Sequence, residues 1–108
     1  SVHDYYEVYY HAFLAGMFKW QYPHTTSNYE SGLGRGDIVI KDPDNNRAAV
    51  VEIKRSDTND SMSSSADRAL RQIADMKYDA PLQGEYPVIL HWGIACHDKS
   101  CVAKSVDG

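Results

Sequence analysis

Two short apolar runs joined by a polar turn constrain the fold of this chain more than any other feature. The runs GDIVIK and AAVVEIK flank the sequence DPDNNR. Asp, Pro and Asn each favour tight turns, for different reasons. The sequence therefore predicts a β-hairpin with strands over Asp37–Lys41 and Ala48–Lys54.

The charges in this hairpin need an explanation, because an unpaired charge away from water costs several kcal/mol. If the turn is centred between Asp44 and Asn45, residues whose numbers add up to 89 lie opposite each other, so Asp37 faces Glu52. Their Cβ atoms are then about 4.5–5.5 Å apart. Lys54 lies on the same face as Glu52, because side chains alternate along a strand.

Two opposed carboxylates repel each other, and two explanations for their placement remain open. In the first, Lys54 bridges them in an ion-pair cluster on a solvent-facing surface, which is stabilising by about 0.2–1 kcal/mol per pair. In the second, a hard divalent cation lies between them, because such cations prefer oxygen ligands and keep several waters. A cation, a water and the amine of Lys54 at one place form a set of groups that can hydrolyse a phosphodiester.

The rest of the chain predicts two helices and three further strands. Apolar residues recur at helical spacing near the start, Tyr22-Pro23 closes that region, and Ser65 is expected to cap a second helix. The expected elements are a helix over 2–18, a strand over 25–30, the hairpin, a flexible connector over 56–65, a helix over 65–78, a strand over 86–96 and a short edge strand over 101–106. This α-β-β-β-α-β-β order predicts an α/β domain with a mixed central sheet flanked by helices.

Length and charge limit the function. With 108 residues the chain is expected to form a single domain, 1–108, and Ser1 at its start suggests a piece of a longer chain. The net charge of −4 argues against binding of nucleic acid by bulk attraction alone, so a basic patch, a cation or another domain has to compensate. Neither a signal peptide nor a membrane span is visible, and two cysteines make no disulfide framework, so a cytoplasmic location is expected.

The hairpin residues resemble the Asp…Glu-x-Lys signature of the PD-(D/E)XK nuclease superfamily. Here the signature reads GRGDIVI followed by VVEIKR, with Gly36 where the family pattern has Pro. The segments SNYESGLGRGDIVIKDP, AVVEIKRSD, ALRQIADMKY and VILHWGIACHDKSCVAKSV together resemble the nuclease-like domain that follows an ATPase-like domain in bacterial proteins. The resemblance covers nearly the whole chain. It implies the restriction-endonuclease-like α-β-β-β-α-β core and an N-terminal domain in the parent chain.

The resemblance also implies a metal site. Asp37 and Glu52 would bind Mg²⁺ or Mn²⁺, together with the carbonyl oxygen of Ile53. Glu30 is the first choice for a further carboxylate ligand, because it lies close upstream of Asp37, and Glu7 on the first helix is the second. A solvated surface position is the alternative for both.

Four more residues are expected to act on water or substrate. Lys54 would orient or activate the attacking water. Gln72 and Tyr78 stand where related nucleases carry a Gln…Tyr motif on the helix beside the site, and Arg35 would contact phosphate. Polar surface is the alternative for Gln72 and Arg35, and helix-end packing is the alternative for Tyr78.

The function implied by the resemblance is metal-dependent hydrolysis of phosphodiester bonds, in DNA ahead of RNA. The alternative is a catalytically weak or inactive nuclease-fold module that serves binding, regulation or oligomerisation in a larger protein. The first helix carries an excess of aromatic residues, and such nucleases often act as dimers. A homodimer through this helix is therefore compatible with either function.

Overall fold

The structure is a computed structural model that describes residues 2–28 and 34–107. The described residues form two α-helices, five strands and two single-turn 3₁₀ helices. These elements are α1 (Val2–Gln21), β1 (His24–Ser27), β2 (Ile38–Asp42), η1 (Pro43–Asn45), β3 (Arg47–Arg55), α2 (Met62–Met76), η2 (Ala80–Leu82), β4 (Val88–His97) and β5 (Ser100–Asp107). The predicted order of helices and strands is confirmed, although β5 is longer than the predicted edge strand.

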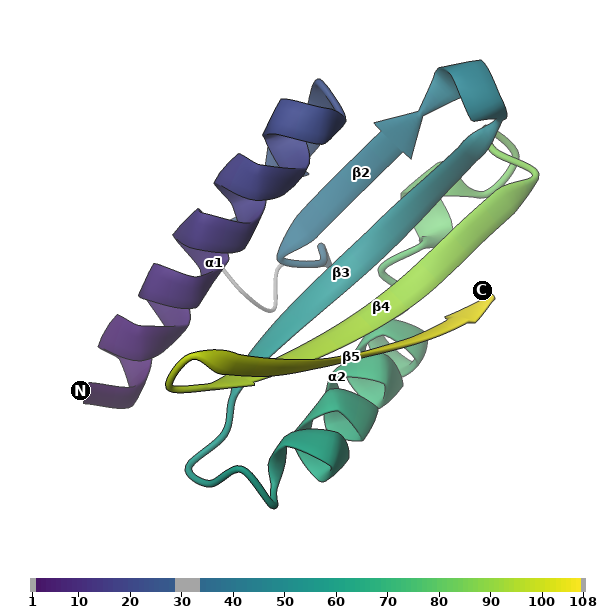
Figure 1. Cartoon of the computed structure of the whole chain (residues 1–108). Coiled ribbons are helices and arrows are strands. Elements are labelled where there is room, and N and C mark those ends of the chain that lie inside the picture. The colour runs from purple at the N-terminus through teal and green to yellow at the C-terminus, as the bar shows by residue number, and fades with distance from the viewer. Residues whose placement is uncertain (1, 29–33, 108) are drawn as a thin grey trace.

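The strands form one mixed sheet in the order β1-β2-β3-β4-β5 (Figure 1). The β1–β2, β2–β3 and β4–β5 pairs are antiparallel, and β3 and β4 are parallel. A parallel pair needs a crossover connection, which α2 supplies. Figure 1 shows α1 and α2 on opposite sides of the sheet, as the predicted fold class requires.

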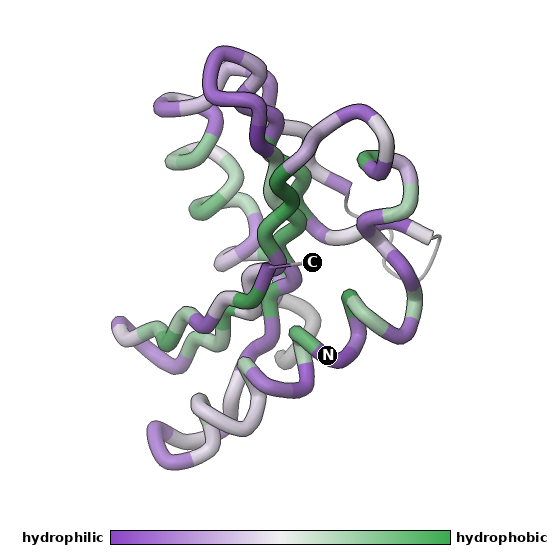
Figure 2. Tube along the Cα trace, turned by 90° about the vertical axis from the view of Figure 1, so that its right-hand side faces the viewer, coloured by the Kyte–Doolittle hydropathy of each residue, from purple (hydrophilic) through white to green (hydrophobic). Residues whose placement is uncertain are grey.

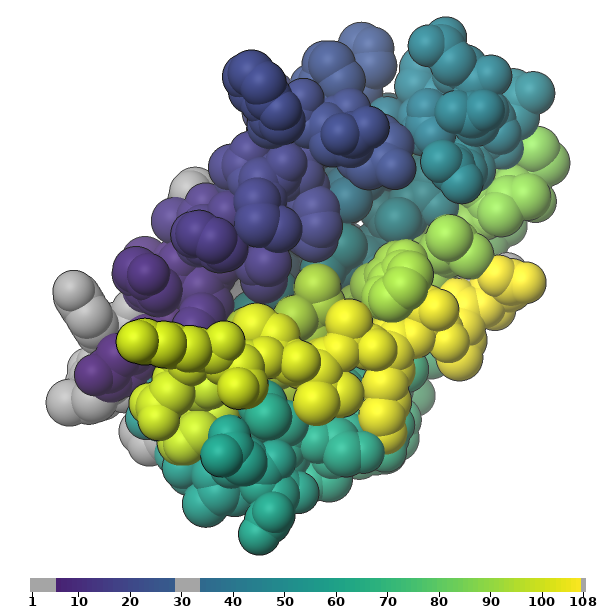
Figure 3. Space-filling model, viewed as in Figure 1, coloured from purple at the N-terminus to yellow at the C-terminus, as the bar shows by residue number. Residues whose placement is uncertain are grey.

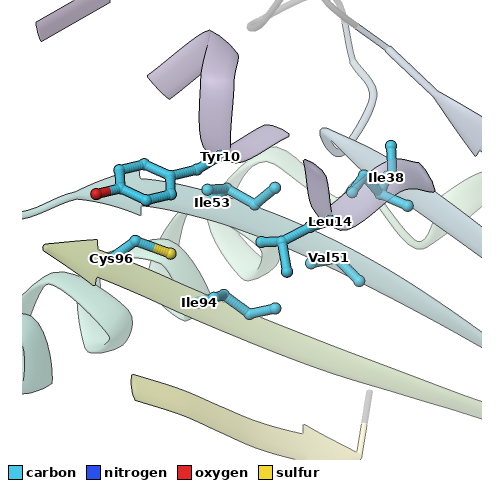
Figure 4. Close-up of a cluster of buried hydrophobic side chains, with 8 residues drawn as sticks. Tyr10, Leu14, Ile38, Val51, Ile53, Ile94 and Cys96 are labelled. Atoms are coloured by element: carbon cyan, nitrogen blue, oxygen red, sulfur yellow. The ribbon is translucent and has the colours of Figure 1, made fainter. Parts of the chain in front are cut away.

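Alternation along β3 divides the core into two layers. Val51 and Ile53 pack against α1, whereas Val50 packs against α2. The cluster under α1 consists of Tyr10, Leu14, Ala15, Ile38, Val51, Ile53, Ile94 and Cys96 (Figure 4). The clusters under α2 consist of Ala48, Val50, Ile73, Tyr78, Leu82 and Ile89, and of Met62, Ala66 and Ala95. Figure 2 shows the most hydrophobic stretch of the trace along the central strands.

The β2–β3 hairpin has the register that its turn predicts. Ile38 lies opposite Val51, so opposed residue numbers add up to 89. At the turn, Asp42 Oδ2 accepts hydrogen bonds from Asn45 Nδ2 at 3.0 Å and from Arg47 Nε at 2.8 Å. These bonds fix the turn, and the turn fixes which residues face each other at the far end of the hairpin.

α1 is longer than predicted and ends at Gln21 rather than near residue 18. The amide of Tyr22 donates to the carbonyl oxygen of Phe18 at 2.7 Å, and Lys19 Nζ donates to the carbonyl oxygen of Thr25 at 3.3 Å. These bonds hold the last turn until Pro23. Among the described residues, no helix combines the length and the apolar character needed to cross a membrane.

The first strand is shorter than predicted. β1 ends at Ser27, and Asn28 already lies outside it. The last two residues of the predicted strand, Tyr29 and Glu30, lie outside the described part of the chain.

The second helix begins earlier than predicted. α2 starts at Met62 and follows Ser61, so Ser65 is not the cap but a buried residue inside the helix. Met62 is also buried and packs beside Ala66 and Ala95. Burial of this one methionine fixes the first turn, and the predicted connector is shortened to residues 56–61.

α2 ends at Met76 in a Schellman motif, two residues before the predicted end. Lys77 takes the left-handed conformation, with φ of 54°. Its amide donates to the carbonyl oxygen of Ala74 at 3.3 Å. The amide of Tyr78 donates to the carbonyl oxygen of Ile73 at 3.1 Å, and the Tyr78 side chain is buried. The motif therefore turns the chain back beneath the helix.

Candidate active site

Asp37 and Glu52 face each other at the open end of the β2–β3 hairpin. Asp37 directly precedes β2 and continues its register, which places it opposite Glu52 of β3. The Asp37 amide donates to Glu52 Oε1 at 3.2 Å, and Asp37 Oδ2 accepts from the Ile53 amide at 2.8 Å. The predicted pairing across the hairpin is present, and backbone amides hold both carboxyl groups in place.

Both carboxyl groups hold their protons more tightly than usual. Glu52 is 2% exposed, and its burial together with the neighbouring Asp37 charge raises its pKa to about 8. Burial also raises the pKa of Asp37, although the bond from the Ile53 amide and nearby positive groups act to lower it. Two carboxyl groups in this position resist joint ionisation. A cation between them would remove that resistance.

Lys54 connects the carboxyl pair to α2. Its Nζ lies 3.8 Å from Glu52 Oε2 and donates to Gln72 Oε1 at 2.5 Å. Gln72 Nε2 in turn donates to Tyr78 OH at 3.1 Å. Both ends of the Gln72 amide therefore have partners, which fix its orientation. The structure brings Lys54, Gln72 and Tyr78 together beside the carboxyl pair, and Tyr78 also packs at the helix end.

Asn28 holds the backbone that carries Asp37. Its Nδ2 donates to the carbonyl oxygen of Gly36 at 3.0 Å, and its amide donates to the carbonyl oxygen of Asp37 at 2.8 Å. A Cβ at position 36 would lie 2.5 Å from Val50 Cγ1, so this close approach to β3 requires glycine. The sequence prediction placed Asn28 inside the first strand and gave it no role, because a single polar residue there carries no signal of its contacts.

Gly93 brings α2 close to Glu52. It is the register partner of Glu52 on β4. A Cβ at position 93 would collide with the carbonyl oxygen of Ala66 and would lie 3.1 Å from side-chain atoms of Ala69 and Leu70. The helix therefore covers Glu52 closely. A glycine inside an apolar strand is the signal that could have identified this approach.

His11 is a second residue that the sequence prediction missed. Its side chain is buried on α1, and its Nε2 lies 2.7 Å from Ser27 Oγ of β1. It is near enough to act on Asp37, because a positive charge at His11 lowers the pKa of that carboxyl group. Only the packing of α1 against β1 brings this histidine to the site.

The other predicted site residues are Arg35, Glu7 and Glu30. Arg35 and Glu7 are both exposed, Arg35 on the segment before Gly36 and Glu7 on α1. Glu30 lies outside the described residues. Within residues 2–28 and 34–107, no three His, Cys, Asp or Glu side chains are arranged to hold a metal ion. Among the described side chains, the carboxyl pair therefore offers two ligands.

The donor chemistry of the pair fits a hard divalent cation. Both side chains offer only oxygen, which Mg²⁺ and Mn²⁺ prefer over nitrogen and sulfur. Mg²⁺ keeps several waters and is commonly held by one or two carboxylates. Two protein carboxylates are therefore sufficient for such an ion when water and substrate oxygens complete the coordination.

A family model of the PD-(D/E)XK nuclease superfamily matches residues 5–106. The chain belongs to this superfamily. The match runs from α1 into β5 and confirms both the resemblance and the restriction-endonuclease-like fold class. Proteins of the superfamily are generally nucleases, bind nucleic acid and typically use divalent metals. No curated protein and no solved structure matches the chain.

Proposed function

We propose that this domain is a metal-dependent nuclease that hydrolyses phosphodiester bonds, with DNA expected ahead of RNA as the substrate. The observation that supports it most is the opposed pair Asp37 and Glu52, with Lys54 Nζ 3.8 Å from Glu52 Oε2. A purely structural ion-pair cluster explains this arrangement poorly. Glu52 is buried rather than solvent-facing, and one lysine, Lys54, faces two carboxyl groups while it also donates to Gln72.

Asp37 and Glu52 would hold Mg²⁺ or Mn²⁺, with the carbonyl oxygen of Ile53 as a further ligand and Glu30 as the first choice for another carboxylate. When bound, such an ion acidifies water and neutralises charge that develops on phosphoryl oxygens. The amides that bond to Glu52 Oε1 and Asp37 Oδ2 at 3.2 Å and 2.8 Å would keep the carboxylates in position.

Lys54 would orient the attacking water or contact a phosphoryl oxygen. Its ammonium group has three protons. One is donated to Gln72 and another is directed toward Glu52, which leaves the third for water or substrate. Gln72, held by Tyr78, sets the direction of the Lys54 side chain. Arg35, exposed just before the site, is available for a phosphate contact.

The proposal is tested by cleavage of labelled single- and double-stranded DNA and of RNA, in Mg²⁺ or Mn²⁺ and in EDTA. Loss of a residue that assists proton transfer lowers a rate by about 10²–10⁴-fold, so Lys54→Ala is expected to lose cleavage by such a factor. Lys41→Ala is the matched control. Lys41 lies in the neighbouring strand and forms an exposed ion pair with Glu85 at 3.4 Å, so cleavage should be unchanged.

Cleavage that persists in Lys54→Ala or in EDTA would contradict the assigned roles. Absence of cleavage of every substrate by the folded wild-type chain would instead support the alternative function, a catalytically inactive nuclease-fold module.

A further inference from the structure

The two cysteines of the chain lie opposite each other on the last hairpin of the sheet. Cys96 of β4 and Cys101 of β5 are register partners in an antiparallel pair, joined by a turn at residues 98–99. Directly opposed residues in such a pair have side chains on the same face and Cα atoms about 4.5–5.5 Å apart. A disulfide bond takes Cα atoms about 4.4–6.8 Å apart. The backbone of this hairpin therefore has the geometry that a disulfide needs.

The two sulfur atoms are in contact. Both residues are free thiols, and Cys96 Sγ lies 2.7 Å from Cys101 Sγ. A covalent bond between them requires only a small further approach of the two atoms. The bond can therefore form without a shift of either strand.

Two other parts of the chain hold this end of the hairpin in place. The Ser56 amide, after β3, donates to the Cys96 carbonyl oxygen at 2.8 Å, and His97 Nδ1 lies 2.9 Å from the Ser56 carbonyl oxygen. From α1, Tyr10 OH donates to the carbonyl oxygen of Asp98 at 2.7 Å. These bonds keep the two thiols together in the folded chain.

The two thiols differ in their access to solvent. Cys96 is fully buried in the cluster under α1, beside Tyr10 (Figure 4). Burial and the neighbouring Cys101 thiol raise the pKa of Cys96. Cys101 is exposed on the edge strand of the sheet, and Figure 3 shows the β4–β5 turn, coloured yellow-green, at the surface beside α1. An oxidant from solvent can therefore reach Cys101 more easily than Cys96.

We propose that Cys96 and Cys101 form a modification site, at which a hydroperoxide converts the two thiols reversibly into a disulfide bond. The hydroperoxide first transfers one oxygen atom to the Cys101 sulfur, which gives a sulfenic acid and releases an alcohol, or water when the oxidant is hydrogen peroxide. The Cys96 sulfur then attacks the Cys101 sulfur. The S–S bond forms, the S–O bond breaks, and the Cys96 proton leaves with the hydroxyl group as water.

The electrons balance in this reaction, and a thiol reverses it. The two thiols together lose two electrons, which the O–O bond of the hydroperoxide takes up as it breaks. A dithiol reductant returns them by thiol–disulfide exchange. The oxidised chain should resist unfolding more than the reduced chain, because the bond restrains the hairpin in the unfolded state. The site does not depend on the proposed nuclease function, and its test measures covalent structure and unfolding alone.

Trypsin provides a direct test, because Lys99 lies between the two cysteines. Complete cleavage after lysine and arginine leaves Cys96 in the peptide 78–99 and Cys101 in the peptide 100–104. The folded wild-type chain is treated with hydrogen peroxide, its remaining thiols are alkylated in denaturant, and it is then digested. Mass spectrometry should find the two peptides joined, and the intact chain should have the mass of one chain less two hydrogen atoms. Dithiothreitol should separate the peptides and restore both thiols.

Cys101→Ser is the matched control. The buried Cys96 of this variant should stay a free thiol under the same treatment. In Cys96→Ala, Cys101 has no neighbouring thiol, so its sulfenic acid should go on to the sulfinic acid or link two chains.

Three results would overturn the proposal. In the first, peroxide oxidises wild-type Cys101 to the sulfinic acid while Cys96 stays a free thiol. In the second, peroxide leaves both thiols unchanged or joins two chains instead of closing one. In the third, the oxidised chain unfolds at a lower urea concentration than the reduced chain, which would show that the hairpin does not have the geometry of a disulfide.

Discussion

Replacing Glu52 with Gln is expected to make the stability of the metal-free domain less sensitive to pH. Gln keeps the size of the side chain and an oxygen that can accept the bond from the Asp37 amide, 3.2 Å long in the wild type. The substitution removes a carboxyl group whose pKa rises from 4.5 to about 8 through burial and the Asp37 charge. Between these values, folded Glu52 keeps a proton that the unfolded chain has already lost.

The sign and the size of the effect follow from proton linkage. A carboxyl group with a raised pKa contributes stability that is fully present below its unfolded pKa and is lost as the pH rises toward its folded pKa. In the middle of this window the loss is about 1.4 kcal/mol per pH unit, so the wild type loses about 2–2.5 kcal/mol from this group between about pH 5 and pH 7. Gln does not titrate, so the variant does not lose this free energy. The stability of Glu52→Gln relative to the wild type should therefore rise by the same amount between about pH 5 and pH 7.

The assay is urea unfolding followed by circular dichroism in EDTA, at several pH values, for both proteins. The informative quantity is how the difference in free energy of unfolding between the two proteins changes with pH. Glu52→Gln also loses the ionic contact with Lys54, which affects the absolute stability more than it affects this pH dependence. Glu85→Gln serves as the control, since Glu85 is an exposed carboxylate paired with Lys41, and it should keep the pH dependence of the wild type. A difference between Glu52→Gln and the wild type that stays flat or shrinks from pH 5 to pH 7 would refute the reasoning.

Four further substitutions test the backbone, the packing and the hydrogen bonding of the domain. Gly93→Ala is expected to destabilise the domain by about 1–3 kcal/mol, because the new Cβ collides with α2. Gly16 has open space around it, so Gly16→Ala should stabilise the domain by about 0.5–1 kcal/mol. Equal effects of the two substitutions in urea unfolding would contradict this. Lys77 has the left-handed backbone conformation, with φ of 54°, which glycine adopts more easily than lysine. Lys77→Gly is therefore expected to raise the free energy of unfolding by up to about 1 kcal/mol. A lower melting temperature would contradict this. Tyr78→Phe leaves Gln72 Nε2 without its acceptor. It is therefore expected to lower the cleavage rate about tenfold with little change in KM. An unchanged rate would show that Tyr78 is not part of the site.

The hairpin could be predicted because one local rule determines it. Its turn residues fix the register, so the opposition of Asp37 and Glu52 follows from counting along the chain. The start of α2 could not be predicted in the same way. The sequence predicted Ser65 as the cap, but α2 begins three residues earlier, at Met62, which is buried beside Ala95 of β4. That contact joins residues far apart in the sequence and has no local signal.

In the candidate site as well, some residues could be predicted from the sequence and others could not. The resemblance to a known family pointed to Gln72 and Tyr78, and the structure brings both to Lys54 through the turn at the end of α2. Asn28 and His11 could not be predicted, because their contacts depend on which elements pack side by side. Neither residue belongs to a pattern that can be read along the chain.

The central claim is that Asp37 and Glu52 share a divalent cation, and calorimetric titration of Mn²⁺ into the metal-free chain tests it most directly. The wild type is expected to bind the ion, and Asp37→Asn is expected to bind it at least about tenfold more weakly, because one of two charged ligands is lost. Asp44→Asn, which removes an exposed carboxylate from the hairpin turn, should bind like the wild type. Equal affinity of the wild type and Asp37→Asn would contradict the claim.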